Sequence, residues 1–280
     1  MTRLAPSVDE DEQVPVPLVY ALLPNKTTAA YETVLNAVKD EADRMGVRNI
    51  TPSFVMTDME LAEKNAVADV FPSAQVRYCF FHVGQACYRR VQDEGLQFQY
   101  RSETDRSTKD ALHMMLALAF VPVGDVPAAF ELLYEEIPEN MLPVVSNFEE
   151  LYINGKKFRG NRRNIPPRYP PKLWNCYDAT LQNFHRTNNI SERWHNRFQT
   201  VVGEHHPSLY GCLKEFQKEQ ADCETMLYQL DLGQRVKAAP KKKWLRTQQR
   251  IRNIVATYEE YATSNRQVDY LWNVGYNFVL

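Results

Sequence analysis

Two acidic residues lie at positions from which a carboxylate could take part in catalysis. Asp58 lies at the end of a β-like run that opens with residues 51–56, and Glu192 falls in the first turn of a helix expected over residues 190–202. Carboxylates on separate elements can converge on Mg²⁺ or Mn²⁺, and paired ions of this kind serve nucleases and polymerases. Each acid also has a plainer interpretation, because Asp58 can cap the following helix and Glu192 can cap its own.

Alternating strand and helix patterns surround Asp58 and predict how it is positioned. Such alternation favours a parallel α/β sheet, in which chemistry sits at the carboxyl ends of the strands. Cys79 and His82 end the next strand, so we expect them beside Asp58. The expected elements are strands over residues 14–23, 51–56 and 74–81, with helices over residues 59–70 and 83–92.

From residue 107 onward the apolar pattern becomes helical, with no strands between the helices. Helices expected over residues 109–120, 126–137 and 140–152 predict an all-helical insertion. For the aromatic residues near the C-terminus we favour a small packed core over base stacking. The expected organisation is a disordered acidic lead-in (1–13), a first core part (14–106), the helical insertion with a basic loop (107–172), a last core part with the Glu192 helix (173–236), and a basic, aromatic tail (237–280).

The composition is that of an ordinary globular protein. The chain has 280 residues, a formal net charge of −2 and 44% hydrophobic residues. No apolar run approaches the roughly 18 residues that would predict a membrane span. The five cysteines show no paired framework, which suits a reducing compartment. The acidic N-terminus lacks the apolar core of a secretory signal.

Two long stretches are rich in Lys and Arg and contain no acidic residue. One runs between Glu150 and Asp178, and the other runs between Asp231 and Glu259. Such blocks can neutralise DNA phosphates. The alternatives are a solvated surface and, for residues 241–243, a nuclear import signal. The DNA-binding residues that we expect are Lys156, Lys157, Arg159, Arg162, Arg163 and Arg186.

Several segments, in order and with their spacing, resemble the Mutator-like (MULE) transposases over most of residues 14–230. The matching pieces are VPLVYALLPNKT, FVMTDMELA, FPSAQVRYCFFHVGQACYRRVQ, ALAFVPVGDVPAAF, LWNCYD, RTNNISERWHNRF and HHPSL. The resemblance implies an α/β, RNase H-like mixed sheet with a helical insertion. It also implies a DDE-type site that cleaves DNA and transfers strands with Mg²⁺ or Mn²⁺. The expected partners are transposon ends, target DNA and a second copy of the chain, without a membrane, in the nucleus.

The resemblance also implies roles for individual residues. Asp58 corresponds to the second acid of the DDE triad and Glu192 to the last, so both would be catalytic metal ligands. Cys79 and His82 correspond to the family's Cys-x-x-His signature, which we interpret as structural or site-supporting. A zinc site is the alternative, and it would need two more ligands. Other residues expected to support the site are Asn188, Asn189 and His195.

One departure from the family concerns the first acid of the triad. The family's first Asp lies on a strand upstream of the VPLVYALLPNKT segment, whereas the acids that precede Val14 here, Asp9 and Asp11 among them, lie in a polar run. We therefore expect a sheet that is incomplete at its N-terminus and a truncated, catalytically impaired transposase. The alternatives are a non-catalytic DNA-binding or protein-interaction protein derived from a transposase, and a helical interaction module with no nucleic-acid role.

Overall fold

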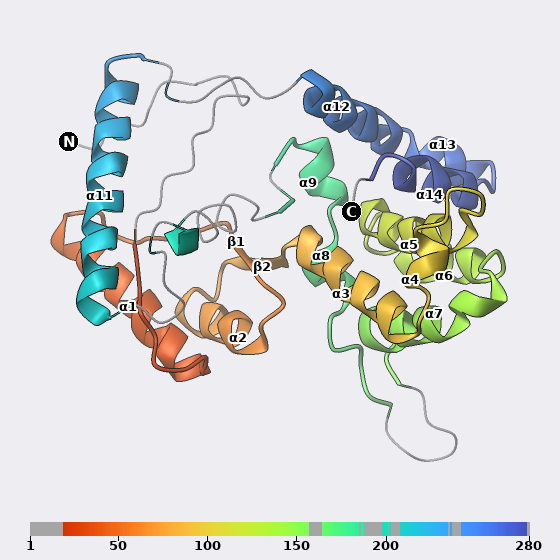
Figure 1. Ribbon diagram of the computed structural model, residues 1–280, viewed down its shortest axis with the longest axis horizontal. Coiled ribbons are helices and arrows are strands. Elements are labelled where there is room, and N and C mark those ends of the chain that lie inside the picture. The colour runs from red at the N-terminus through yellow and green to blue at the C-terminus, as the bar shows by residue number, and fades with distance from the viewer. Residues whose placement is uncertain are drawn as a thin grey trace.

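The computed structural model shows a mostly helical α/β protein with a small parallel sheet. In Figure 1 the two strands lie between a group of helices from the N-terminal part of the chain and a larger helical body. No helix in the described part of the chain is both long enough and apolar enough to cross a membrane. The structure describes residues 19–156, 164–184, 186–187, 198–200, 202, 208–234, 236 and 242–278.

The sheet and its crossover helix follow the predicted strand–helix–strand order. Strand β1 (Phe54–Thr57) pairs in parallel with β2 (Gln75–Tyr78), and helix α2 (Leu61–Val70) connects them. Parallel strands require such a crossover. The buried side chains of α2 are those of Ala66, Val67 and Val70. Helix α1 (Thr28–Arg44) packs against α2 and is capped by the Thr27 hydroxyl, which accepts from the Ala30 amide.

The strands are shorter than the sequence pattern predicted. The expected strand over residues 74–81 ends at Tyr78, because helix α3 (Phe80–Asp93) already begins at Phe80. Of the expected strand over residues 14–23, residues 19–23 have no regular structure and the rest lie outside the described residues. The α/β class is confirmed, whereas the RNase H-like mixed sheet stays a prediction.

Helices predominate over residues 107–153, as the pattern predicted, and they supply much of the hydrophobic core of the described structure. Buried side chains from them include Leu112, Phe120, Leu133 and Phe148, and Trp174 of a later helix joins this core. Together with α3 and the C-terminal helices these elements make one helical body. The elements are α4 (Gln97–Tyr100), α5 (Ser107–Ala117), η2 (Leu118–Phe120), α6 (Val126–Tyr134), η3 (Glu139–Met141), α7 (Leu142–Phe148), η4 (Glu149–Ile153), α8 (Pro171–Trp174) and α9 (Tyr177–Leu181).

The C-terminal tail folds into helices that complete this body. Helices α12 (Lys242–Ala256), α13 (Tyr258–Thr263) and α14 (Gln267–Gly275) bring buried Tyr258 and Tyr270 into its core, as expected for a packed aromatic cluster. Helix α14 lies against α5, where Gly275 allows a close approach to His113. A Cβ atom at position 275 would come within 2.9 Å of the His113 backbone.

A buried histidine connects α5 to the C-terminal helix. His113 Nδ1 lies 3.1 Å from the Gly275 carbonyl, and its Nε2 lies 3.2 Å from the Tyr100 hydroxyl. Burial lowers the pKa of His113 to about 4, so the ring is neutral at pH 7.

The remaining long helix, α11 (Leu209–Asp231), is capped by the Ser208 hydroxyl, which accepts a hydrogen bond from the Gly211 amide.

Candidate functional site

The carboxyl ends of the two strands bring Asp58 and His82 together. Asp58 follows the last residue of β1, and His82 lies in the first turn of α3, just after β2. His82 Nδ1 is 3.2 Å from Asp58 Oδ1, which is close enough for an ion pair when the imidazole is protonated. The Asp58 side chain is 51% exposed and that of His82 is 24% exposed. The predicted proximity of these two residues is therefore present in the structure.

Two further carboxylates lie close to Asp58. Glu60 accepts hydrogen bonds from the Tyr31 hydroxyl (3.1 Å) and from the Lys26 ammonium group (3.3 Å). Glu63 is largely buried, and its pKa is raised to about 7, chiefly by this burial. The negative charges of Asp58 and Glu60 act on the pKa in the same direction. A hydrogen bond from the Asp58 backbone acts in the opposite direction but does not offset burial. The acids at positions 58, 60 and 63 are the sequence signal from which this cluster could be predicted.

We expect Glu63→Gln to raise the melting temperature at pH 8 and to change it little at pH 5. The folded-state pKa of Glu63 is raised above its unfolded value of 4.5, so the folded protein binds the extra proton between about pH 4.5 and 7. Stability is therefore lost as pH rises through that window, because the ionised carboxylate is buried near other anions. The amide removes this charge. Thermal unfolding of both proteins across pH 5–8 measures the difference.

The matched control for this experiment is Glu32→Gln on the neighbouring helix α1. It removes the same kind of charge from a partly exposed position of α1. We expect its melting temperature to follow that of the wild type at every pH. A Glu63→Gln protein with the same pH dependence as the wild type would contradict the raised pKa.

Cys79 has a structural position between the strands and α3. Its side chain is fully buried, its residue is the N-cap of α3, and its amide donates to the Thr57 carbonyl at 2.9 Å. Among the described residues, no three or more His, Cys, Asp and Glu side chains form a group that could hold a metal ion. The described part of the chain thus adds no ligand to Cys79 and His82 for the alternative zinc site.

Arg186 anchors the start of the Glu192 motif to this same edge. Its carbonyl accepts from the Phe80 amide, the first of α3, at 3.0 Å. Its guanidinium group lies over the Phe120 ring at 5.4 Å and donates to the Thr180 hydroxyl at 3.4 Å. Burial lowers the pKa of Arg186 from its ordinary value. These contacts give Arg186 a positioning role, and the DNA contact expected for it stays a prediction.

The other predicted site residues divide between described and undescribed parts of the chain. Lys156 lies at the base of the basic loop, where it pairs with Ile165 across a β-bridge and lies 3.6 Å from the Glu150 carboxylate. Of the expected helix over residues 190–202, residues 198–200 and 202 are helical. Outside the described residues lie Glu192, Asn188, Asn189, His195, Lys157, Arg159, Arg162 and Arg163.

The donor chemistry at the strand ends suits a divalent cation only in part. Asp58 offers an exposed carboxylate, the ligand that Mg²⁺ and Mn²⁺ prefer. Glu63 is largely protonated below pH 7 and is therefore a weaker ligand there. Asp58 is thus the one described residue that we would assign to a metal, and a full set would need further oxygen donors.

The segment that contains this site is similar to a known protein family. Residues 4–86 match the MULE transposase domain. The match confirms the resemblance over this segment, and a MULE transposase domain suggests a transposase-related function. The MULE segment contains both strands and ends within α3, so Asp58, Cys79 and His82 all lie inside it. No curated protein and no solved structure matches the chain.

Proposed function

We propose that the chain is a MULE-type DDE transposase domain, the domain that cleaves DNA and transfers strands in transposition, and that its catalysis is impaired. The observation that carries this proposal is the position of Asp58. It lies inside the MULE segment, at the carboxyl end of a parallel strand and within 3.2 Å of His82. Open α/β sheets bind their ligands at such strand ends. DNA is the substrate that the family match supports.

In this proposal each residue at the strand ends has a defined task. Asp58 and Glu192 are the carboxylate ligands of Mg²⁺ or Mn²⁺, which when bound would polarise the scissile phosphate and activate the attacking oxygen. His82 holds the Asp58 carboxylate in orientation through Nδ1. The hydrogen bond from the Phe80 amide to the Arg186 carbonyl fixes the start of the segment that leads to Glu192.

A second candidate function is DNA binding without catalysis, and one surface favours it. Lys242, Lys243, Arg246 and Arg250 are exposed and recur along α12, while Ile251 and Val255 of the same helix are buried in the helical body. Such a face can contact successive phosphates. The two candidates differ in whether Asp58 is needed for a metal-dependent activity.

The proposed function is tested by replacing Asp58 with Asn, which keeps the size of the side chain but removes the charge. We expect weak Mn²⁺ binding by the full chain, and a loss of at least about tenfold in affinity in Asp58→Asn, because even groups that only support a ligand contribute 10–100-fold. Titration of Mn²⁺ followed by electron paramagnetic resonance measures both affinities. Nicking of supercoiled plasmid in the presence of Mn²⁺ reports on catalysis.

Asp69→Asn provides the matched control, since Asp69 is an exposed acid on α2 within the same segment. It should bind Mn²⁺ as the wild type does. If Asp58→Asn and Asp69→Asn bind Mn²⁺ equally, Asp58 is not a metal ligand. If all three proteins bind DNA but none binds Mn²⁺ or nicks the plasmid, the non-catalytic DNA-binding candidate is favoured.

A further inference from the structure

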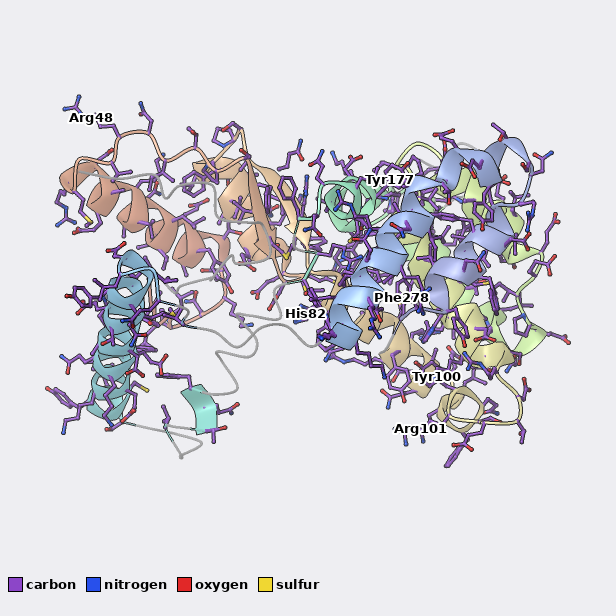
Figure 2. The ribbon with its side chains drawn as sticks, turned by 90° about the horizontal axis from the view of Figure 1, so that it is seen from above. Arg48, His82, Tyr100, Arg101, Tyr177 and Phe278 are labelled. Carbon is purple, nitrogen blue, oxygen red and sulfur yellow. The ribbon has the colours of Figure 1, made fainter. Side chains whose placement is uncertain are left out.

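A cavity of about 390 Å³ opens beside the strand ends, and apart from His82 its lining residues take no part in the metal chemistry proposed above. Residues from α3, α7 and η4 form most of it. His82, the partner of Asp58, lines it, and so does Met59, the residue after Asp58. Figure 2 shows His82 on the side of the helical body that faces the strands. The volume is within the 300–1,000 Å³ that is usual for binding small organic groups.

The cavity wall combines flat aromatic rings with amide groups. Phe148 and Tyr152 stack with their ring centroids 4.8 Å apart, and Tyr169 lies 5.3 Å from Tyr152. Gln85 and Asn147 line the same space with side-chain amides, each of which carries both a donor and an acceptor. Planar faces together with paired donors and acceptors are what proteins use to hold a base that has left its stack.

An arginine on the wall has a donor that its protein neighbours do not use. Arg90 pairs with Glu94 through a terminal nitrogen, but its Nε is buried and has no hydrogen-bond partner in the described structure. A buried donor without a partner is costly, so it favours a ligand that brings an acceptor. Ring nitrogens and carbonyl oxygens of a nucleobase are such acceptors.

We propose that this cavity receives one unpaired nucleobase of the DNA strand that lies along the Asp58–His82 edge. The inference rests on the proposed function, because it takes DNA as the substrate. Proteins hold an extruded base between aromatic and polar side chains, and a base that is already unpaired enters such a pocket at the lowest cost. In this chain the base would lie against the aromatic wall while the backbone passes His82.

The experiment compares two duplexes of identical sequence in their binding to the full chain. One is fully paired, and the other carries a single unpaired 2-aminopurine. We expect the duplex with the unpaired base to bind at least about tenfold more tightly, because no pair has to be broken. We also expect the fluorescence of the 2-aminopurine to change on binding as its stacking partners change.

Ala86→Leu fills the cavity from α3, and Ala37→Leu makes the same change on an exposed position of α1. The preference for the unpaired base should be lost in Ala86→Leu and kept in Ala37→Leu, with affinity for the paired duplex unchanged in both. Equal affinity of the wild type for the two duplexes would overturn the inference, and so would a preference that survives in Ala86→Leu. Should Ala86→Leu fail to fold, the wild-type comparison still decides. A wild type that binds neither duplex would instead overturn the proposed function.

Discussion

Replacing Phe120 with Ala is expected to lower the free energy of unfolding by about 3–5 kcal/mol, the usual cost of removing a fully buried aromatic ring. The side chain is 1% exposed. Its ring lies 5.2 Å from that of Phe80 and 5.4 Å from that of Phe278, and the Arg186 guanidinium group lies over it. One substitution therefore loosens α3, the C-terminus and the Arg186 anchor together. Urea unfolding of the variant and the wild type measures the loss.

Phe98→Ala is the control for this prediction, because Phe98 is 78% exposed and its truncation should change stability by less than about 0.5 kcal/mol. The prediction fails if the two Ala variants unfold at the same urea concentration. Because Phe120 supports both Phe80 and Arg186, we also expect weaker Mn²⁺ binding in Phe120→Ala under conditions where it is still folded.

Gly155→Ala should destabilise the base of the basic loop by at least about 3 kcal/mol, through two separate costs. Gly155 has φ +71°, a left-handed conformation that costs a residue with a Cβ about 1–2 kcal/mol. The added Cβ would also lie 2.2 Å from the Ile165 carbonyl oxygen and 2.6 Å from the Pro166 carbonyl carbon. Backbone atoms cannot move aside as a flexible side chain can, so the loop base must open.

Hydrogen exchange measures this effect at the two amides that close the loop. Lys156 and Ile165 each donate to the other's carbonyl, at 2.8 and 3.0 Å, and both amides should exchange faster in Gly155→Ala. Gly46→Ala separates the two costs, since Gly46 has φ +81° but no atom within 4 Å of an added Cβ. We expect it to cost about 1 kcal/mol. Equal effects of the two variants would show that the contact with Ile165 is unimportant.

The local elements were predictable where the sequence pattern alone determines them. The crossover from β1 through α2 to β2 follows the alternation of strand and helix patterns that surrounds Asp58. The early start of α3 at Phe80 was not predictable from residues 74–81, which are apolar enough for a longer strand. There the Phe80 amide is satisfied by Arg186, a partner remote in sequence.

The same limit applies to the candidate site. Local sequence placed Asp58 and His82 at neighbouring strand ends, and the structure brings them to 3.2 Å. The raised pKa of Glu63 and the cavity beside His82 depend on burial and on residues from α7 and η4, which no short-range pattern contains. Arg186 is a further example, because its packing on Phe120 joins residues far apart in the sequence and no local pattern contains it.

The hydrogen bond between Phe80 and Arg186 has a consequence for the order of folding. The helical body between these residues is rich in local contacts, which form quickly, whereas this bond closes a loop of roughly a hundred residues. The loop-closure entropy is lower once the helices between have packed and brought its ends together. We therefore expect the strand-end site to assemble last, after the helical body, so that a folding intermediate would have a native-like aromatic core before Arg186 reaches α3.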